Sequence, residues 1–169
     1  GCGAERVVTT SPHCYNTFVN EYQGLDLQVQ HYTQFVAGLI EEGRLTFSGE
    51  VNKIVTYHDP CFLGKQNGIF EEPRTILKSI PGLDFREFDR SRERSLCCEG
   101  GGGRMWVEAT TAGERLAEVR VKDAVAMEVE VIATACPFCL LTIEDAVKTT
   151  GHEEEIQVMD IMELVAQAI

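Results

Sequence analysis

Five cysteines stand out because their spacing places them on three separate turns. They are Cys61, Cys97, Cys98, Cys136 and Cys139, in the pattern C-x35-C-C-x37-C-x2-C. Thiolates arranged in this way are typical of a cage around an inorganic centre. The side chains of adjacent cysteines diverge and fit poorly on one tetrahedral ion, so the vicinal pair favours a cluster with several metal atoms.

Zinc is the main alternative to such a cluster, because C-x2-C is a common zinc spacing. A zinc ion takes four tetrahedral ligands, which leaves one of the five cysteines unused. Disulfides or free thiols are the third interpretation. No apolar stretch has the length of a signal peptide or a membrane span, so we expect a reducing cytoplasm, where metal binding outranks disulfide formation.

Two of the turns are expected to begin where buried strands end. In HDPC, at 58–61, Pro60 holds Cys61 in an extended turn. CPFC, at 136–139, places two sulfurs where a strand passes into a helix. Backbone N–H groups at the start of a helix favour the thiolate over the thiol.

The third turn is rich in glycine. In CCEGGGG, at 97–103, two adjacent sulfurs are followed by Glu99 and four glycines. We expect Gly100, Gly101 and Gly102 to let the main chain approach a bulky cluster and to point N–H groups at its sulfides. Such hydrogen bonds raise the reduction potential of a cluster.

Several other residues, most of them near the five cysteines, are weaker candidates for a functional role. His58, beside Asp59, is a candidate proton donor, although a local hydrogen-bonding role is the more common one for such a histidine. Cys2 and Cys14 stand alone and are interpreted as small apolar residues. Trp106, just past the glycines, is expected to cover the site from water.

Composition bounds the class of protein. The 169 residues suit one domain or one and a fraction, and 44% of them are hydrophobic. The net charge of −12 argues against nucleic acid and favours a basic docking partner. Because the chain opens at Gly1 with no initiator methionine, we interpret it as a fragment or an excised domain.

An internal repeat organises the chain. Residues 7–18 align with 132–143 at an offset of 125, and residues 27–40 align with 156–169 at an offset of 129. We therefore interpret 1–42 as the C-terminal part of a first, degenerate unit and 43–169 as a complete second unit. Ser11 stands where Cys136 stands in the second unit, so the first unit has lost one potential ligand.

Strand and helix patterns alternate, which predicts an α/β fold with a largely parallel sheet flanked by helices. The ligands of such sheets collect at the carboxyl ends of the strands, so HDPC and CPFC should share one edge. Strands are predicted at 6–10, 27–30, 53–57, 83–88, 130–135 and 156–159. Helices are predicted at 11–22, 32–42, 73–79, 112–128, 136–149 and 160–168.

The three motifs HDPC, CCEGGGG and ACPFC together resemble the cysteine-rich (CCG) domain family. This family includes heterodisulfide reductase catalytic subunits and the iron–sulfur subunits of glycolate and lactate oxidation systems. The resemblance covers essentially the whole chain. Glu99 departs from it, because the family usually has glycine there, and Ser11 departs from it in the first unit.

The resemblance implies an iron–sulfur electron-transfer domain of a heterodisulfide-reductase-like oxidoreductase. It implies a non-cubane double [4Fe-4S] cluster or a single [4Fe-4S] cluster, which air would destroy. Electrons would come from a ferredoxin-type domain or a flavoprotein and pass to a disulfide or, through a membrane subunit, to a quinone. A zinc-stapled docking module is the alternative. The expected location is the cytoplasm, or the inner face of the membrane through a partner or an upstream domain. The cluster ligands implied are Cys61, Cys97, Cys98, Cys136 and Cys139.

Overall fold

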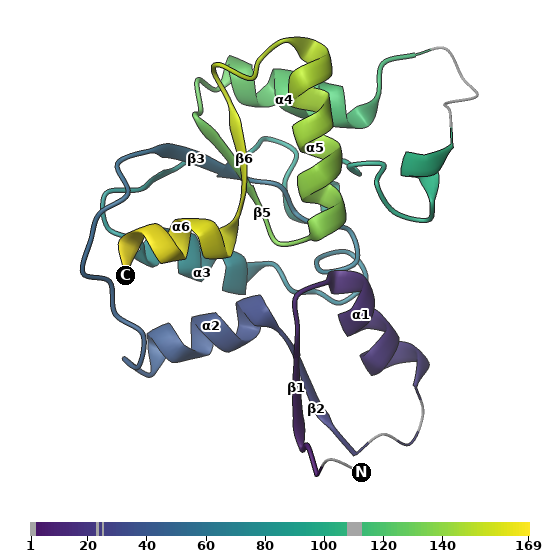
Figure 1. Cartoon of the computed structure of the whole chain (residues 1–169), viewed down its shortest axis with the longest axis vertical. Helices are drawn as coiled ribbons and strands as arrows, with labels where there is room; N and C mark the ends of the chain where they lie inside the picture. The colour runs from purple at the N-terminus through teal and green to yellow at the C-terminus, as the bar shows by residue number, and fades with distance from the viewer. Residues whose placement is uncertain (1–2, 23, 25, 108–112) are drawn as a thin grey trace.

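The computed structural model describes residues 3–22, 24, 26–107 and 113–169. Within these ranges strands and helices alternate in an α/β fold, as predicted. The larger sheet has four strands, all parallel, in the order β4–β3–β5–β6. These strands are β3 (Ile54–Tyr57), β4 (Asp84–Phe85), β5 (Val131–Thr134) and β6 (Gln157–Asp160). Figure 1 labels β3, β5 and β6 of this sheet.

A second, smaller sheet is formed by the N-terminal part of the chain. Its strands β1 (Arg6–Thr9) and β2 (Gln28–His31) are parallel and pair with each other. The strands therefore divide into two parallel sheets, and the four-stranded one carries the complete set of cysteine turns.

The helices are α1 (Pro12–Asn16), α2 (Tyr32–Glu41), α3 (Glu71–Ser79), α4 (Leu116–Ala126), α5 (Pro137–Thr150) and α6 (Ile161–Ala168). Helix α1 packs against β1 and β2, whereas helices on both faces cover the four-stranded sheet. Side chains alternate along a strand, so Val131 and Ala133 of β5 face one core and Ile132 faces the other. The first core also takes residues from α2, α3 and α6, and the second takes residues from α4 and α5, on opposite sides of the sheet in Figure 1.

Most predicted elements are found, with differences at their ends. Strand β4 covers two residues instead of six, because the chain leaves the edge of the sheet and Phe88 enters the second core under the guanidinium of Arg120. Helix α3 begins at Glu71, two residues early. Helix α4 begins at Leu116, whereas the predicted start at 112 lies outside the described residues.

The β–α–β–α arrangement of the N-terminal sheet is also found in the C-terminal half. Arg6 pairs with Gln28, and Val131 pairs with Gln157, which are the positions that the two sequence offsets equate. His31 and Asp160 each cap the following helix through a capping box. The two segments therefore share strand register as well as element order.

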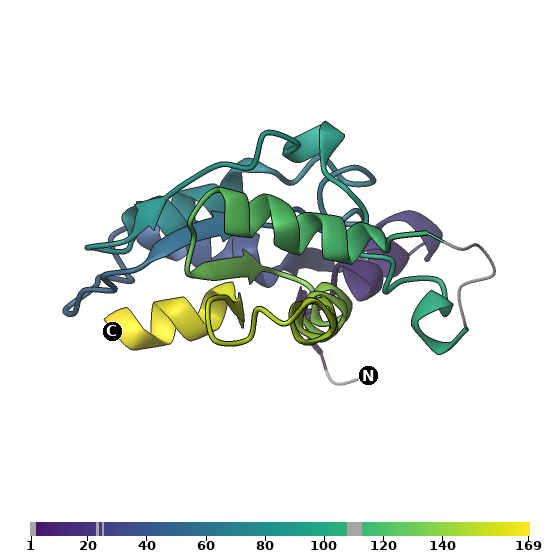
Figure 2. The same cartoon turned by 90° about the horizontal axis from the view of Figure 1, so that it is seen from above.

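Figure 2 shows the domain from above, with the short turn Arg104–Trp106 standing away from its body. Among the described residues no helix is both long enough and apolar enough to cross a membrane.

Candidate metal centre

Two of the three cysteine turns lie at the same edge of the sheet, as predicted. HDPC follows β3 and CPFC follows β5, and Tyr57 and Ala133 are register partners in these adjacent parallel strands. The backbone N–H of His58 extends the pairing by donating to the carbonyl of Ala133 at 2.8 Å. The carboxyl ends of β3 and β5 therefore bring Cys61 close to the CPFC turn.

The third turn closes the site. The five thiols influence one another's pKa as neighbours in one row, in the order Cys61, Cys97, Cys98, Cys139, Cys136. Cys98, Cys136 and Cys139 are buried, Cys61 is partly buried and Cys97 is exposed. The row therefore runs from the surface into the second core and includes every cysteine of the predicted ligand set.

The thiols of this row shift one another's pKa in opposite directions. The neighbouring thiols of Cys61 and Cys98 lower the pKa of Cys97 well below its usual value. The neighbouring thiol of Cys97, together with burial, raises the pKa of Cys61. Five thiolates packed this closely repel one another, so all five can ionise together only beside a positive centre.

Backbone N–H groups point at the sulfurs from both sides. The N–H of Glu99 lies 3.3 Å from Sγ of Cys97, and the N–H of Gly100 lies 3.4 Å from Sγ of Cys98. At the start of α5, a hydrogen bond from the Cys139 thiol lowers the pKa of Cys136, with further support from the N–H groups of Cys139 and Phe138. These donors suit a centre built from anionic sulfur.

The glycines act in different ways. A Cβ atom at Gly100 would collide with Oγ1 of Thr142 and lie 2.9 Å from the carbonyl oxygen of Phe138. A Cβ at Gly101 would lie 3.3 Å from Nε2 of His13, whereas Gly102 has a φ of +64° and open space around it. Gly100 therefore lets the turn pack against the first turn of α5.

Glu99 occupies a left-handed backbone conformation, with a φ of +63°. An L-residue is strained there, whereas glycine adopts this conformation readily. The Glu99 carboxylate compensates by accepting a hydrogen bond from the backbone N–H of Leu116 at 2.7 Å, and it pairs with Arg104 at 3.2 Å. The side chain of Glu99 thus fixes the glycine-rich turn to the start of α4.

His58 lies behind the sulfurs and is only 1% exposed. One of its ring nitrogens and the sulfurs of Cys98 and Cys139 all lie within 4.8 Å of one another. Neither ring nitrogen has a hydrogen-bond partner among the described residues. Burial lowers the pKa of His58 to about 3, so its ring is neutral at pH 7.

Two buried arginines support the site, and nothing in the sequence pattern indicated them. Arg74, 1% exposed, holds Asp59 in a bidentate pair and also bonds Glu87. Arg120, also 1% exposed, donates to the carbonyl of Arg90 at 2.9 Å. Asp59, Glu87 and Arg90 lie 13 to 30 residues from the arginines that they bind, so no local pattern could have revealed these pairings.

Other cysteines and aromatics lie apart from the row of thiols. Cys14 is exposed, and Cys2 lies outside the described residues. Trp106 is 81% exposed. The expectation that Trp106 covers the site was wrong, because the turn that carries it projects into solvent (Figure 2).

Comparison with known proteins places these features in context. The sequence profile of the cysteine-rich domain family, CCG, matches residues 55–144. The chain is 40% identical to a probable iron–sulfur-binding oxidoreductase of Bacillus subtilis, across 98% of this chain and 24% of the relative. It is 37% identical to an EtfAB:quinone oxidoreductase of Syntrophomonas wolfei, across 99% and 24%.

A third relative comes from Methanosarcina barkeri. The chain is 37% identical to one subunit of the dihydromethanophenazine:CoB–CoM heterodisulfide reductase of that organism, across 99% of this chain and 41% of the relative. The chain thus spans between a quarter and two fifths of the length of these three relatives.

Proposed function

Because this chain belongs to the cysteine-rich domain (CCG) family, we propose that it holds an iron–sulfur cluster and passes electrons within a larger oxidoreductase. One observation carries the proposal: five thiols from three turns lie as neighbours in a single row. The names of the relatives support it, since they describe iron–sulfur binding, quinone reduction and heterodisulfide reduction.

The proposed cluster ligands are the five cysteines of the row. Both members of the vicinal pair belong to it, which favours the non-cubane double [4Fe-4S] cluster over a single [4Fe-4S] cluster with four ligands. When bound, such a cluster accepts and releases electrons at a potential that its surroundings set. Here those surroundings are N–H donors from the glycine-rich turn and from the start of α5. The ligands are Cys61, Cys97, Cys98, Cys136 and Cys139.

His58 suits a supporting role at this site. Its ring is buried and neutral, and it lies beside Cys98 and Cys139. A neutral imidazole can donate one N–H hydrogen bond to sulfur. We therefore favour hydrogen bonding over proton delivery for His58.

The larger assembly is proposed from the relatives and from the charge of this chain. The electron donor would be a flavoprotein or a ferredoxin-type domain, and the acceptor a disulfide or a quinone in a membrane subunit. The net charge of −12 favours a basic docking surface on the partner. Residues 1–42 would be the C-terminal part of a first cysteine-rich unit, and 43–169 the second; the matching strand registers support this division.

A zinc-stapled docking module is the second candidate, and one observation favours it. His58, Cys98 and Cys139 have the mutual spacing of zinc ligands, and one neighbouring cysteine would complete a tetrahedron. Such a site leaves two of the five thiols without a role, so it ranks second.

Anaerobic reconstitution separates the two candidates. The reduced protein is incubated with ferrous iron and sulfide, or with zinc, and bound metal and sulfide are measured. The proposal expects a brown protein with iron and sulfide in similar amounts. Uptake of one zinc and no iron by a colourless protein would contradict it. The substitution His58→Gln should weaken zinc uptake only if the second candidate is correct.

A further inference from the structure

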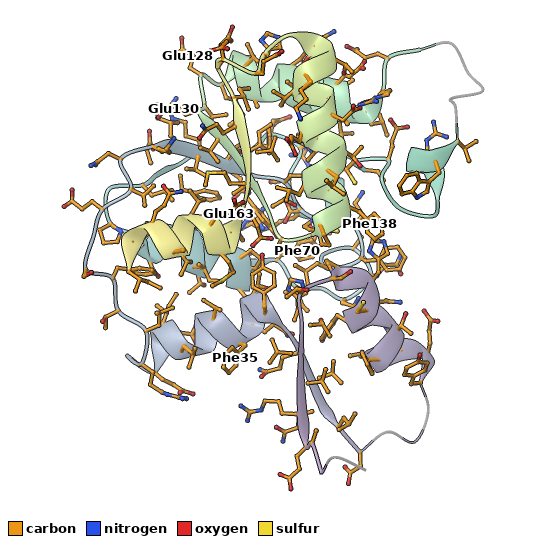
Figure 3. All side chains as sticks on the ribbon, in the orientation of Figure 1. Phe35, Phe70, Glu128, Glu130, Phe138 and Glu163 are labelled. Atoms are coloured by element: carbon orange, nitrogen blue, oxygen red, sulfur yellow. The ribbon has the colours of Figure 1, made fainter. Side chains whose placement is uncertain are left out.

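The imidazole of His13 lies where the three cysteine turns meet. Its ring centroid is 4.3 Å from that of Phe62, which directly follows Cys61, and 5.1 Å from that of Phe138, within CPFC. Figure 3 shows Phe138 at the start of α5, where α5 comes close to α1. Nε2 of His13 lies so close to Gly101 that a Cβ there would be 3.3 Å away. One residue from each turn therefore contacts this ring.

Both ring nitrogens of His13 are buried and have no hydrogen-bond partner among the described residues. Burial lowers the pKa of His13, so the ring is neutral and offers one donor and one acceptor. A buried N–H group without an acceptor destabilises the folded protein. Among the described residues, the ring N–H of His13 therefore has no acceptor at the junction of the three turns.

Asparagines fix the helix that carries His13 against the Cys61 turn. Asn67 donates to the carbonyl of Phe62 at 2.6 Å and to Oδ1 of Asn16 at 3.1 Å. Asn20 donates to Oδ1 of Asn67 at 2.9 Å. Since Asn16 and Asn20 follow His13 along the same helical segment, the position of the ring is set by contacts outside the row of thiols.

His13 and Phe138 are equivalent positions in the proposed repeat, separated by the offset of 125. They are in edge-to-face contact with each other. At this junction the second unit therefore supplies the apolar ring of Phe138. The first unit supplies the ring of His13, which is of similar size and can form hydrogen bonds. Phenylalanine is accordingly the natural replacement that keeps the packing of His13 and removes its donor.

We propose that His13 donates a hydrogen bond to a sulfur anion held where the three turns meet. The proposal rests on the proposed function, because a cluster must be present to hold that anion. The acceptor is either a sulfur atom of the cluster or the thiolate of a small thiol bound beside it. His13 is thus a positioning residue that the N-terminal unit contributes to the site of the second unit.

The test compares His13→Phe with His13→Gln, which keeps a donor, in the anaerobically loaded protein. His152→Phe is the matched control, because half-buried His152 lies just past the end of α5, outside the three cysteine turns, with Nδ1 3.4 Å from the carboxylate of Glu155. Iron content, the paramagnetic signal and the midpoint potential of the cluster are measured first. Each protein is then titrated with 2-mercaptoethanol, with the visible spectrum as the readout.

Iron content should be equal in all four proteins. If the acceptor is a cluster sulfur, His13→Phe lowers the midpoint potential without added thiol, and His13→Gln recovers part of it. If the acceptor is a bound thiolate, the potential is unchanged and the Kd for the thiol rises roughly tenfold in His13→Phe.

Two outcomes overturn the inference. His13→Phe could match the unsubstituted protein in potential, paramagnetic signal and thiol affinity while carrying full iron. Alternatively, both His13 variants could lose iron equally, which would make the ring a packing element only. Failure of the unsubstituted protein to take up iron would instead refute the proposed function, and the inference with it.

Discussion

The carboxylate of Asp59 and the guanidinium of Arg74 form a bidentate pair inside the protein, with N–O distances of 2.7 and 2.9 Å. Asp59 also accepts the backbone N–H of Arg92 at 2.9 Å. Asp59 lies two residues before Cys61, and Arg92 lies on the segment that leads to Cys97. The pair therefore joins two of the three cysteine turns.

Replacing Asp59 with asparagine should destabilise the protein. The substitution removes a buried charge partner of Arg74, and breaking such a pair costs about 3 kcal/mol even though Glu87 remains. Urea unfolding of the reduced, metal-free protein measures the loss. Asp84→Asn is the matched control: it breaks an exposed pair with Arg86 and should cost about 1 kcal/mol or less. Equal costs for the two substitutions would refute the structural role of Asp59.

Backbone strain at Glu99 predicts which of two variants, Glu99→Gly and Glu99→Ala, is the more stable. Glu99→Ala keeps the left-handed backbone and loses the hydrogen bond to the N–H of Leu116, whereas Glu99→Gly relieves the strain. The glycine variant should therefore be more stable than the alanine variant by about 1 kcal/mol in urea unfolding. If alanine proves the more stable of the two, Glu99 is not strained in solution.

Close packing at Gly100 predicts a loss of iron. In Gly100→Ala the new methyl group meets the carbonyl oxygen of Phe138, which is backbone and cannot move aside, so the turn that carries Cys98 must shift. Iron content after anaerobic reconstitution should fall to below about half of the unsubstituted value. Gly38→Ala is the control, because its Cβ meets nothing within 4 Å and alanine favours a helix interior. Full iron in Gly100→Ala would show that the turn adapts.

Buried His31 predicts a pH dependence of stability. Burial lowers the pKa of His31 to about 4, below the unfolded value of 6.5. Between these values the unfolded chain binds more protons, so stability that is present above pH 6.5 is lost as the pH falls towards 4, by up to about 3 kcal/mol.

His31→Asn keeps a good helix cap and removes the titrating group. The free energy of unfolding of this variant should fall less steeply between pH 6.5 and 4 than that of the unsubstituted protein, when both are measured in urea at each pH. His58 continues to contribute in both proteins, because burial lowers its pKa as well. Identical slopes would exclude His31 as a source of the acid sensitivity.

Local patterns were sufficient for the α/β class and for the positions of most strands. Proline at the starts of α1 and α5 and glycine at the end of α5 are signals that depend only on neighbouring residues. The parallel class of the sheet also predicted that the turns after β3 and β5 share one edge, whereas the adjacency of the two strands came from the structure.

Long-range pairing limited what the sequence could predict. Arg74 meets Asp59 and Glu87 only in the folded protein, and in a sequence each of them is indistinguishable from a solvated surface charge. The contact between His13 and Phe62 likewise joins two segments that no local pattern relates.

Substitution of each cysteine by serine tests the five-ligand cluster most directly. Serine preserves size but binds soft metal centres poorly. Iron content and the paramagnetic signal are measured after anaerobic reconstitution of the single variants, with Cys14→Ser as the control outside the row. We predict that all five variants at Cys61, Cys97, Cys98, Cys136 and Cys139 lose iron or change signal and that Cys14→Ser changes neither. A variant among the five with full iron and an unchanged signal would contradict the five-thiolate cluster and indicate an ordinary four-ligand site.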